Sequence, residues 1–197
     1  PSAIAVHKDS DYVYVADSTT DSISVFDRNG NFKFSFDDDS GNDFDKPSAM
    51  VIDNKDDILY VADTGNHQIR MFELTDGDDC PSGTDAVVND EVCFVDDFGS
   101  SGSSDGRFDE PAGLAFDEDE SILYVADTEN NRIQSFEIIS GSTCPSGTDE
   151  IIDGVCFIEE FGSSGSSDGK FNSPEGLAFD EANDLLYVAD TENNRIQ

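Results

Sequence analysis

The chain has 197 residues and carries 10 basic against 45 acidic side chains, which gives a formal net charge of −35. This charge excludes nucleic-acid binding, which needs a basic surface to displace phosphate counterions, and it opposes binding to an anionic membrane. Hydrophobic residues make up 36% of the chain and aromatic residues 10%, a composition too apolar for a disordered acidic segment. We therefore expect a folded core beneath an acidic surface.

Neither a membrane span nor a signal peptide is recognisable in the sequence. No apolar run approaches the roughly 18 residues that a membrane-spanning helix requires. The first residue is Pro1 rather than Met. We expect the sequence to be a processed form or a segment of a longer protein.

Internal repetition is the main sequence signal. The tetrapeptide Tyr-Val-Ala-Asp occurs four times, and a proline precedes each copy by thirteen residues. The four copies are Tyr14–Asp17, Tyr60–Asp63, Tyr124–Asp127 and Tyr187–Asp190. Segments 108–134 and 171–197 are almost identical, and the Gly-Ser-rich run 98–106 recurs unchanged at 161–169. The chain therefore consists of four related units, of which the second and third carry an insertion.

Each unit is predicted to contain four short β-strands, which the third unit illustrates in chain order. The first strand, 111–116, begins at the proline and is followed by an acidic turn at 117–120. The second strand, 122–126, is β-branched and aromatic, and a turn of Asp-Thr-Glu-Asn-Asn separates it from the third strand, 132–138. The fourth strand is 156–161. No window has sustained helical periodicity, so the pattern predicts an all-β fold built from the four-stranded blades of a β-propeller.

These motifs resemble the NHL repeat, which joins a Gly-rich stretch, Phe-x-x-Pro-x-Gly, Tyr-Val-Ala-Asp-Thr and Asn-(His/Asn)-Arg-Ile. The resemblance covers the chain outside the two insertions and is weakest in the first unit, where 18–22 replaces the Thr-x-Asn-Asn-Arg turn. It implies a β-propeller, commonly of six blades. The predicted blades are 1–43, 44–107, 108–170 and a partial fourth at 171–197. Because about four blades cannot close an ordinary ring, we expect a larger ring or assembly, completed by further sequence or by another copy.

Each insertion lies between the third and fourth strands and contains two cysteines. Duplication of the whole unit favours the local disulfides Cys80–Cys93 and Cys144–Cys156 over the two other pairings. A zinc site is disfavoured because the chain has no Cys-x-x-Cys and no His beside either pair. A disulfide that closes a loop of this size contributes roughly 3 kcal/mol of stability. Disulfides predict an oxidising location, so we expect the protein to be secreted or on the cell surface.

The aspartate that ends each Tyr-Val-Ala-Asp motif is a candidate for a catalytic, metal-binding or structural role. Recurrence at one position in every unit favours the structural role, since an active site is usually built from what differs between blades. We expect each carboxylate to accept hydrogen bonds from the following turn and, in two units, to pair with an arginine. The residues concerned are Asp17, Asp63, Asp127, Asp190, Arg132 and Arg195.

The acidic stretch 37–43 is the best calcium candidate. Calcium prefers several oxygen ligands on a flexible loop with a glycine, and Asp37, Asp39 and Asp43 are the expected ligands. The stretch lacks EF-hand spacing, and a solvated acidic linker is the favoured alternative. His7 and His67 are interpreted as structural residues. No other cofactor is expected.

Charge is unevenly distributed between the two ends of the predicted blades. The acidic turns and the cysteine insertions share one end, whereas the Asp-Thr-Glu-Asn-Asn turns and the Gly-Ser loops share the less acidic end. We expect the less acidic end to bind a protein or a neutral polar ligand such as a glycan. The asparagines expected there are Asn66, Asn130, Asn131, Asn193 and Asn194.

The sequence favours a non-enzymatic binding or assembly module, such as a structural component of a surface array or filament. Two alternatives stay open, a metal-dependent propeller lyase or hydrolase and a calcium-binding surface-layer component. Equivalent positions carry like residues in successive units, which argues against an active site. The sequence identifies no ligand, and its acidity suggests halophilic or marine adaptation, because a strongly charged surface stays hydrated in salt water.

Added NaCl should raise the melting temperature, because salt screens the repulsion among the acidic side chains within about 10 Å at 0.1 M. Differential scanning fluorimetry across a salt series measures the effect. A further rise with CaCl₂ at constant ionic strength is expected only if calcium has specific sites. A flat response to both salts would contradict salt adaptation and calcium binding together.

Overall fold

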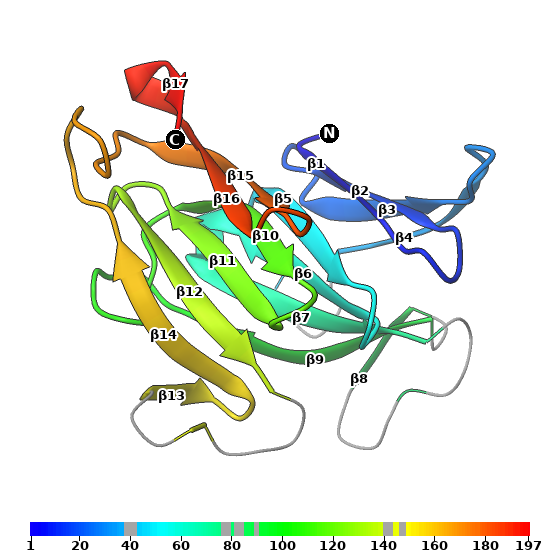
Figure 1. The fold of residues 1–197 in the computed structure, drawn as a ribbon. Helices are drawn as coiled ribbons and strands as arrows, with labels where there is room; N and C mark the ends of the chain where they lie inside the picture. The colour runs from blue at the N-terminus through cyan, green and yellow to red at the C-terminus, as the bar shows by residue number, and fades with distance from the viewer. Residues whose placement is uncertain (38–42, 76–79, 81–84, 89–90, 140–143, 146–148) are drawn as a thin grey trace. The chain divides into compact units, whose positions relative to one another are not determined.

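The computed structural model describes residues 1–37, 43–75, 80, 85–88, 91–139, 144–145 and 149–197. These residues form four antiparallel sheets and two short 3₁₀ turns (Figure 1), which confirms the predicted all-β class. None of the helices in this part of the chain is long and apolar enough to cross a membrane. The chain divides into two compact units, Pro1–Asp97 and Phe98–Gln197.

The first unit contains the first and second sheets, except for Phe98, the last residue of β9, which belongs to the second unit. The first sheet has the order β1-β2-β3-β4, with bounds Ala3–Val6 (β1), Val13–Asp17 (β2), Ser22–Phe26 (β3) and Phe32–Phe36 (β4). The second sheet has the order β5-β6-β7-β9-β8, with bounds Pro47–Asp53 (β5), Ile58–Asp63 (β6), Gln68–Leu74 (β7), Asp85–Val88 (β8) and Val92–Phe98 (β9). The 3₁₀ turn η1, Thr64–Asn66, connects β6 to β7.

The second unit contains the third and fourth sheets. The third sheet has the order β10-β11-β12-β14-β13, with bounds Pro111–Asp117 (β10), Ile122–Asp127 (β11), Arg132–Ile138 (β12), Asp149–Ile152 (β13) and Val155–Phe161 (β14). The fourth sheet has the order β15-β16-β17, with bounds Pro174–Asp180 (β15), Leu185–Asp190 (β16) and Arg195–Ile196 (β17). The 3₁₀ turn η2, Thr191–Asn193, connects β16 to β17.

The cysteine insertions add a strand that the sequence pattern did not predict. Each insertion forms an outer strand, β8 or β13, which pairs antiparallel with the predicted fourth strand. The second and third sheets therefore have five strands instead of four (Figure 1). Disulfides join Cys80 to Cys93 and Cys144 to Cys156, with Cα–Cα distances of 5.7 and 5.5 Å. The predicted local pairing is confirmed.

Phenylalanine rings form the centre of the core in both units. In the first unit Phe72 lies 5.6 Å from Phe36 and 5.8 Å from both Phe44 and Phe94, measured between ring centroids. Phe136 occupies the equivalent place in the second unit, where Phe98, Phe108 and Phe157 surround it. Phe44 and Phe108, which belong to two of the Phe-x-x-Pro motifs, therefore anchor the segment before a first strand to the core of the sheet that this strand begins.

A charged residue, Arg70, is buried in the core of the first unit, at a position where the third sheet has a neutral side chain. Its guanidinium lies 5.0 Å from the ring centroid of Phe44, 5.6 Å from that of Phe72 and 5.2 Å from that of Phe94. The equivalent residue in the third sheet is Gln134. Burial lowers the pKa of Arg70 to about 10, an effect that Asp97 opposes. The guanidinium therefore remains charged at neutral pH and is stabilised by the faces of three aromatic rings.

Replacing Phe72 with Ala should lower the free energy of unfolding by about 3–5 kcal/mol, because a fully buried ring would leave a cavity. Urea unfolding followed by circular dichroism measures the loss. Phe32→Ala is the matched control, since that ring is 58% exposed, and we expect its cost to stay below about 1 kcal/mol. Equal losses for the two variants would contradict the assignment of Phe72 to the core.

Candidate functional site

The recurring aspartate of the third sheet lies at the end of β11 and is fully buried. Its carboxylate accepts hydrogen bonds from the backbone N–H of Asp109 at 2.7 Å and from Asn130 Nδ2 at 3.0 Å. It also accepts from Arg132 Nε at 2.7 Å and from Gln134 Nε2 at 3.1 Å. Asp127 therefore connects the segment before β10, the turn after β11 and strand β12 through one buried charge.

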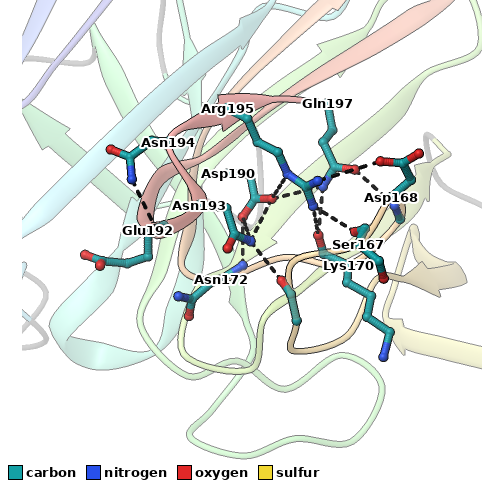
Figure 2. Close-up of polar contacts among 12 residues, drawn as sticks. Ser167, Asp168, Lys170, Asn172, Asp190, Glu192, Asn193, Asn194, Arg195 and Gln197 are labelled. Carbon is teal, nitrogen blue, oxygen red and sulfur yellow. Dashed lines mark hydrogen bonds and ion pairs between the residues drawn. The ribbon is translucent and has the colours of Figure 1, made fainter.

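The fourth sheet repeats this arrangement around Asp190 (Figure 2). The carboxylate accepts from the backbone N–H of Asn172 at 2.7 Å and from Asn193 Nδ2 at 3.0 Å. Arg195 Nε donates at 2.7 Å and Gln197 Nε2 at 3.0 Å. The two clusters match donor for donor, as the near-identity of segments 108–134 and 171–197 requires.

The second sheet has the same carboxylate cluster without the arginine. Asp63 accepts from the backbone N–H of Asp45 at 2.8 Å, from Asn66 Nδ2 at 2.8 Å and from Gln68 Nε2 at 3.2 Å. Gln68 takes the position of Arg132. Burial raises the pKa of Asp63 although these hydrogen bonds oppose the shift, because a neutral amide compensates a buried carboxylate less well than a guanidinium does.

In contrast, the pKa of Asp190 is lowered. Burial acts to raise it, but hydrogen bonds from the Asn172 N–H, Arg195 and Asn193 together outweigh burial. A folded-state pKa below the unfolded value stabilises the fold above the usual carboxyl range, and this stabilisation is lost as the pH falls through the lowered value. In the first sheet, the hydrogen bond from the backbone N–H of Thr19 is the largest cause that lowers the pKa of Asp17.

The two arginines also hold the Gly-Ser loops in place. Arg132 Nη2 donates to the carbonyl oxygens of Ser104 and Arg107 at 3.1 and 3.0 Å, and its Nη1 pairs with Glu160. In the fourth sheet, Arg195 Nη2 donates to the carbonyls of Ser167 and Lys170, each at 2.8 Å (Figure 2). We name the turns 128–131 and 191–194, together with loops 99–106 and 162–169, the loop face.

The asparagines predicted to bind a ligand are themselves part of this network. Asn130 Nδ2 donates to the carbonyl oxygen of Gly102 as well as to Asp127, and Asn193 does the same with Gly165 and Asp190. Asn66 Nδ2 donates to the carbonyl oxygen of Asp43. These three amide groups therefore hold loops to turns.

Asn131 and Asn194 are placed differently, because both adopt left-handed backbone conformations that end their turns. Asn131 Oδ1 accepts from the backbone N–H of Ser173 at 3.0 Å, which joins the third sheet to the fourth. Asn194 is exposed. His67 has the same backbone conformation in the second sheet, and its N–H donates to the carbonyl oxygen of Thr64. The histidine thus occupies a turn position, as the sequence pattern suggested.

The opposite end of the sheets gathers acidic side chains in the second unit. A cavity of about 180 Å³ lies there, and its lining residues are Asp117, Asp119, Glu120, Phe179, Glu181 and Asp184. The rings of Tyr124 and Phe179 stack with centroids 5.6 Å apart. Burial raises the pKa of Tyr124, and nearby carboxylates raise it further. The turns of neighbouring sheets therefore form a negatively charged end, which we name the acidic end.

In the first unit, the corresponding turns are joined by a buried histidine. His7 Nε2 lies 2.8 Å from Asp57 Oδ1 and its Nδ1 lies 2.8 Å from Ser10 Oγ. The backbone N–H of Lys8 donates to Asn54 Oδ1 at 2.9 Å. Both ring nitrogens of His7 are thus engaged with neighbouring side chains, which agrees with a structural role.

Within the described residues, no group of three or more His, Cys, Asp or Glu side chains is arranged to hold a metal ion. Of the three predicted calcium ligands, Asp37 and Asp43 are described and Asp39 lies outside the described residues. The Asp43 carbonyl oxygen accepts the hydrogen bond from Asn66. Calcium binding at this stretch stays a prediction.

Replacing Arg132 with Ala should lower the free energy of unfolding by about 3 kcal/mol, because it would leave the Asp127 carboxylate buried without its cationic partner. Arg28→Ala is the matched control. Its pair with Asp11 is solvent-exposed, so we expect a loss of at most about 1 kcal/mol. Thermal and urea unfolding measure both variants. A loss for Arg132→Ala no larger than that of the control would contradict the structural role of the cluster.

Two family models match the chain. The NHL repeat matches residues 108–136 and 171–197, and the model described as Lactonase, 7-bladed beta-propeller, matches residues 1–95. NHL repeat-containing protein 2 from Bos taurus is 34% identical over 92 residues, and the Homo sapiens protein is 33% identical. Each alignment covers 46% of this chain and 12% of the relative. The chain thus corresponds to a small part of these longer proteins.

Solved structures with the same fold cover almost the whole chain. An auxiliary nutrient binding protein from Bacteroides ovatus aligns with a TM-score of 0.64 and 16% identity, over 98% of this chain and 46% of that one. The Nidogen/Laminin complex gives 0.60 and 16%, over 95% and 56%. Streptogramin B lyase gives 0.58 and 14%, over 100% and 50%.

At these identities, the structural matches establish the fold alone. Together with the repeat motifs, the four antiparallel sheets and the matched carboxylate clusters, they define the architecture as that of a β-propeller. The chain is a β-propeller that contains NHL repeats, which the family model matches at residues 108–136 and 171–197.

Proposed function

We propose that this chain is a non-enzymatic binding and assembly module that works outside the cell or on its surface. The propeller fold and its repeats suit a binding scaffold. Two disulfides favour an oxidising environment. Structural neighbours include a nutrient binding protein and a chain from the Nidogen/Laminin complex, which supports a role in binding a ligand or another protein.

The observation that carries this proposal is the internal use of the recurring polar side chains. Asp127 and Asp190 each accept hydrogen bonds from the same four kinds of donor, which come from their own sheet and the segment before it. The arginines and asparagines beside these carboxylates, which could otherwise act in catalysis, donate hydrogen bonds to backbone carbonyl oxygens of the Gly-Ser loops. They are Arg132, Arg195, Asn130 and Asn193. A catalytic group needs to reach a substrate, whereas the carboxylates of Asp127 and Asp190 are fully buried.

The loop face is the surface proposed to bind the ligand. It presents exposed hydroxyl groups and backbone from Ser101, Ser103 and Ser104, and it lacks the density of carboxylates found at the acidic end. Hydrogen bonds from Arg132 and Asn130 fix this loop before a ligand arrives, so binding would require little further ordering. Hydroxyls and peptide groups suit a glycan or the polar surface of a protein.

A metal-dependent lyase or hydrolase is the second candidate. The match of residues 1–95 to the lactonase model and the fold shared with streptogramin B lyase favour it. Such an enzyme would place its metal among side chains that differ between blades. Calcium is the cation proposed for the acidic side chains, either at 37–43 or as a loosely bound counterion in a surface layer. Turnover of lactone substrates that is abolished by a chelator would support this candidate.

The loop-face proposal predicts that a substitution at Ser103 weakens binding and that one at the acidic end does not. Screening the immobilised chain against a glycan array and a panel of surface proteins identifies ligands, whose affinities are then measured by biolayer interferometry. Ser103→Lys with Ser166→Lys should weaken binding by about tenfold or more, because long charged side chains would obstruct the loops.

Ala182→Lys is the control, since it adds the same side chain at an exposed position in the β15–β16 turn. Unchanged affinity of the Ser103 and Ser166 variant, combined with loss of binding in the Ala182 variant, would overturn the assignment of the ligand to the loop face.

A further inference from the structure

The cavity at the acidic end of the second unit lies between the turns of two neighbouring sheets. Its volume is about 180 Å³, which is smaller than the roughly 300–1,000 Å³ of pockets for drug-sized ligands and suits a single side chain or a small organic ion. We name this space the acidic cavity. The third sheet contributes Asp117, Asp119 and Glu120 to its lining, and the fourth sheet contributes Phe179, Glu181 and Asp184.

The equivalent place in the first unit contains a hydrogen-bonded histidine. His7 and Asp57 lie six and ten residues after the prolines of their repeats, as Asp117 and Asp184 do in the second unit. Asp57 and Asp184 also share a left-handed backbone conformation. In the first unit, His7 Nε2 lies 2.8 Å from Asp57 Oδ1 and so joins neighbouring turns. In the second unit, a carboxylate takes the position of this imidazole.

A hydrogen bond between neighbouring turns shows that the two places are built alike. The backbone N–H of Lys8 donates to Asn54 Oδ1 in the first unit, and that of Glu118 donates to Glu181 Oε1 in the second, each at 2.9 Å. Lys8 and Glu118 occupy one repeat position, and Asn54 and Glu181 occupy another. The turns therefore meet in the same way in both units, and the side chains between them differ.

Asp117 is a buried acid in the wall of the acidic cavity and is only 3% exposed. Its Oδ1 accepts hydrogen bonds from the backbone N–H groups of Asp119 and Glu120 at 2.9 and 3.0 Å. Within the described residues, its Oδ2 has no such donor. Because a buried carboxylate is costly unless it is paired and hydrogen-bonded, a cationic donor inside the cavity would stabilise it.

The charge around the acidic cavity favours an organic cation. Five of its six lining side chains are acidic. Burial raises the pKa of Tyr124, and Asp117 and Asp184 raise it further, so the field at the cavity is strongly negative and attracts positive charge. Among the described residues, which include all six lining residues, no three acidic groups are arranged to hold a metal ion. A larger cation with several hydrogen-bond donors therefore fits better than a metal.

We propose that the acidic cavity binds a guanidinium group, such as the side chain of an arginine. A guanidinium is planar and has several N–H donors that pair with carboxylates, so it bridges Asp117 and Asp184 as the imidazole of His7 reaches Asp57 in the first unit. The ring of Phe179 also lines the cavity and offers an aromatic contact to the cation. The chain already holds one guanidinium against phenylalanine rings, that of Arg70.

This inference goes beyond the proposed function, because it adds a second site with a different ligand. The loop face is proposed to bind a neutral polar ligand or a protein and is tested at Ser103 and Ser166. The acidic cavity binds a cation at the opposite end of the sheets and is tested at its own carboxylates. Failure of one site therefore leaves the other open to test.

A nuclear magnetic resonance titration of the isotope-labelled chain tests the inference at physiological ionic strength. The probe is N-acetylarginine amide, and the neutral N-acetylcitrulline amide is the matched control, because it keeps the shape of the side chain without its charge. The arginine probe should shift the amide signals of 117–120 and 180–184 until they saturate. Its Kd should be at least about tenfold lower than that of the citrulline probe, because its hydrogen bonds to carboxylates are charge-assisted.

Two single substitutions separate a specific site from general attraction to an acidic chain. Asp184→Asn should weaken binding of the arginine probe by about fivefold or more, because it removes one of the two bridged charges. Asparagine tolerates the left-handed backbone of this position. Asp9→Asn is the matched control, since it removes the same charge from an exposed turn of the first sheet, and we expect its effect to stay within about twofold because salt screens distant charges.

A double variant fills the cavity with the side chains of the first unit. Asp117→His with Glu120→Ser copies His7 and the serine that its ring contacts. It should abolish binding of the arginine probe, because the new imidazole would pair with Asp184. Circular dichroism checks that each variant is folded, and Asp184→Asn, at an exposed position, carries the test where the double variant does not fold.

A short capped peptide with one central arginine distinguishes the source of the guanidinium. Binding at least as tight as that of the single amino acid assigns the cavity to an arginine of a partner chain, and weaker binding assigns it to a small guanidine compound. Equal shifts from the citrulline probe, equally tight binding of N-acetyllysine amide, or equal weakening by Asp9→Asn and Asp184→Asn would each overturn the proposal.

Discussion

A buried carboxylate at the end of the second strand fixes the local geometry of the repeat. In the third and fourth sheets, Asp127 and Asp190 each bind a backbone N–H from the segment before the first strand, an asparagine of the following turn and an arginine of the third strand. The arginine then holds the Gly-Ser loop through two backbone carbonyls. Because burial of an unpaired charge is costly, each of these segments is constrained to one position by the same group.

The second sheet shows how the repeat tolerates variation in that cluster. Gln68 stands where the third sheet has Arg132, and Arg70 stands where it has Gln134. In the second sheet, the positively charged side chain is therefore two residues further along the third strand than in the third sheet. It contacts the faces of three phenylalanines instead of the carboxylate of Asp63. The pKa of Asp63 is raised as a consequence of burial with only neutral side-chain donors. The phenylalanine cluster has the same form in both units, so the core is less variable than the polar cluster beside it.

The sequence predicted the features that repetition itself reveals. Four copies of Tyr-Val-Ala-Asp and the alternation of their strands indicated the sheets, and duplication of the insertions indicated the disulfides. Two features could not be read in this way. The side-chain amides of Asn130 and Asn193 donate to the carbonyl oxygens of Gly102 and Gly165, 28 residues earlier in the chain. Because every residue has a backbone carbonyl, the sequence does not indicate which of them accepts such a hydrogen bond. Strands β8 and β13 are four residues long, and each contains only two consecutive β-branched residues, a run too short to predict a strand.

The hydrogen-bonded cluster around Asp190 (Figure 2) is made from residues between Gly165 and Gln197, and its counterpart around Asp127 is made from the equivalent stretch of the chain. A gene segment that encodes such a stretch carries both the buried charge and every group that neutralises it. Copying the segment therefore adds a new sheet without creating an unpaired charge in the old one. This self-sufficiency offers a physical route by which the near-identical third and fourth units arose through tandem duplication, and by which the number of units in such proteins changes over evolution.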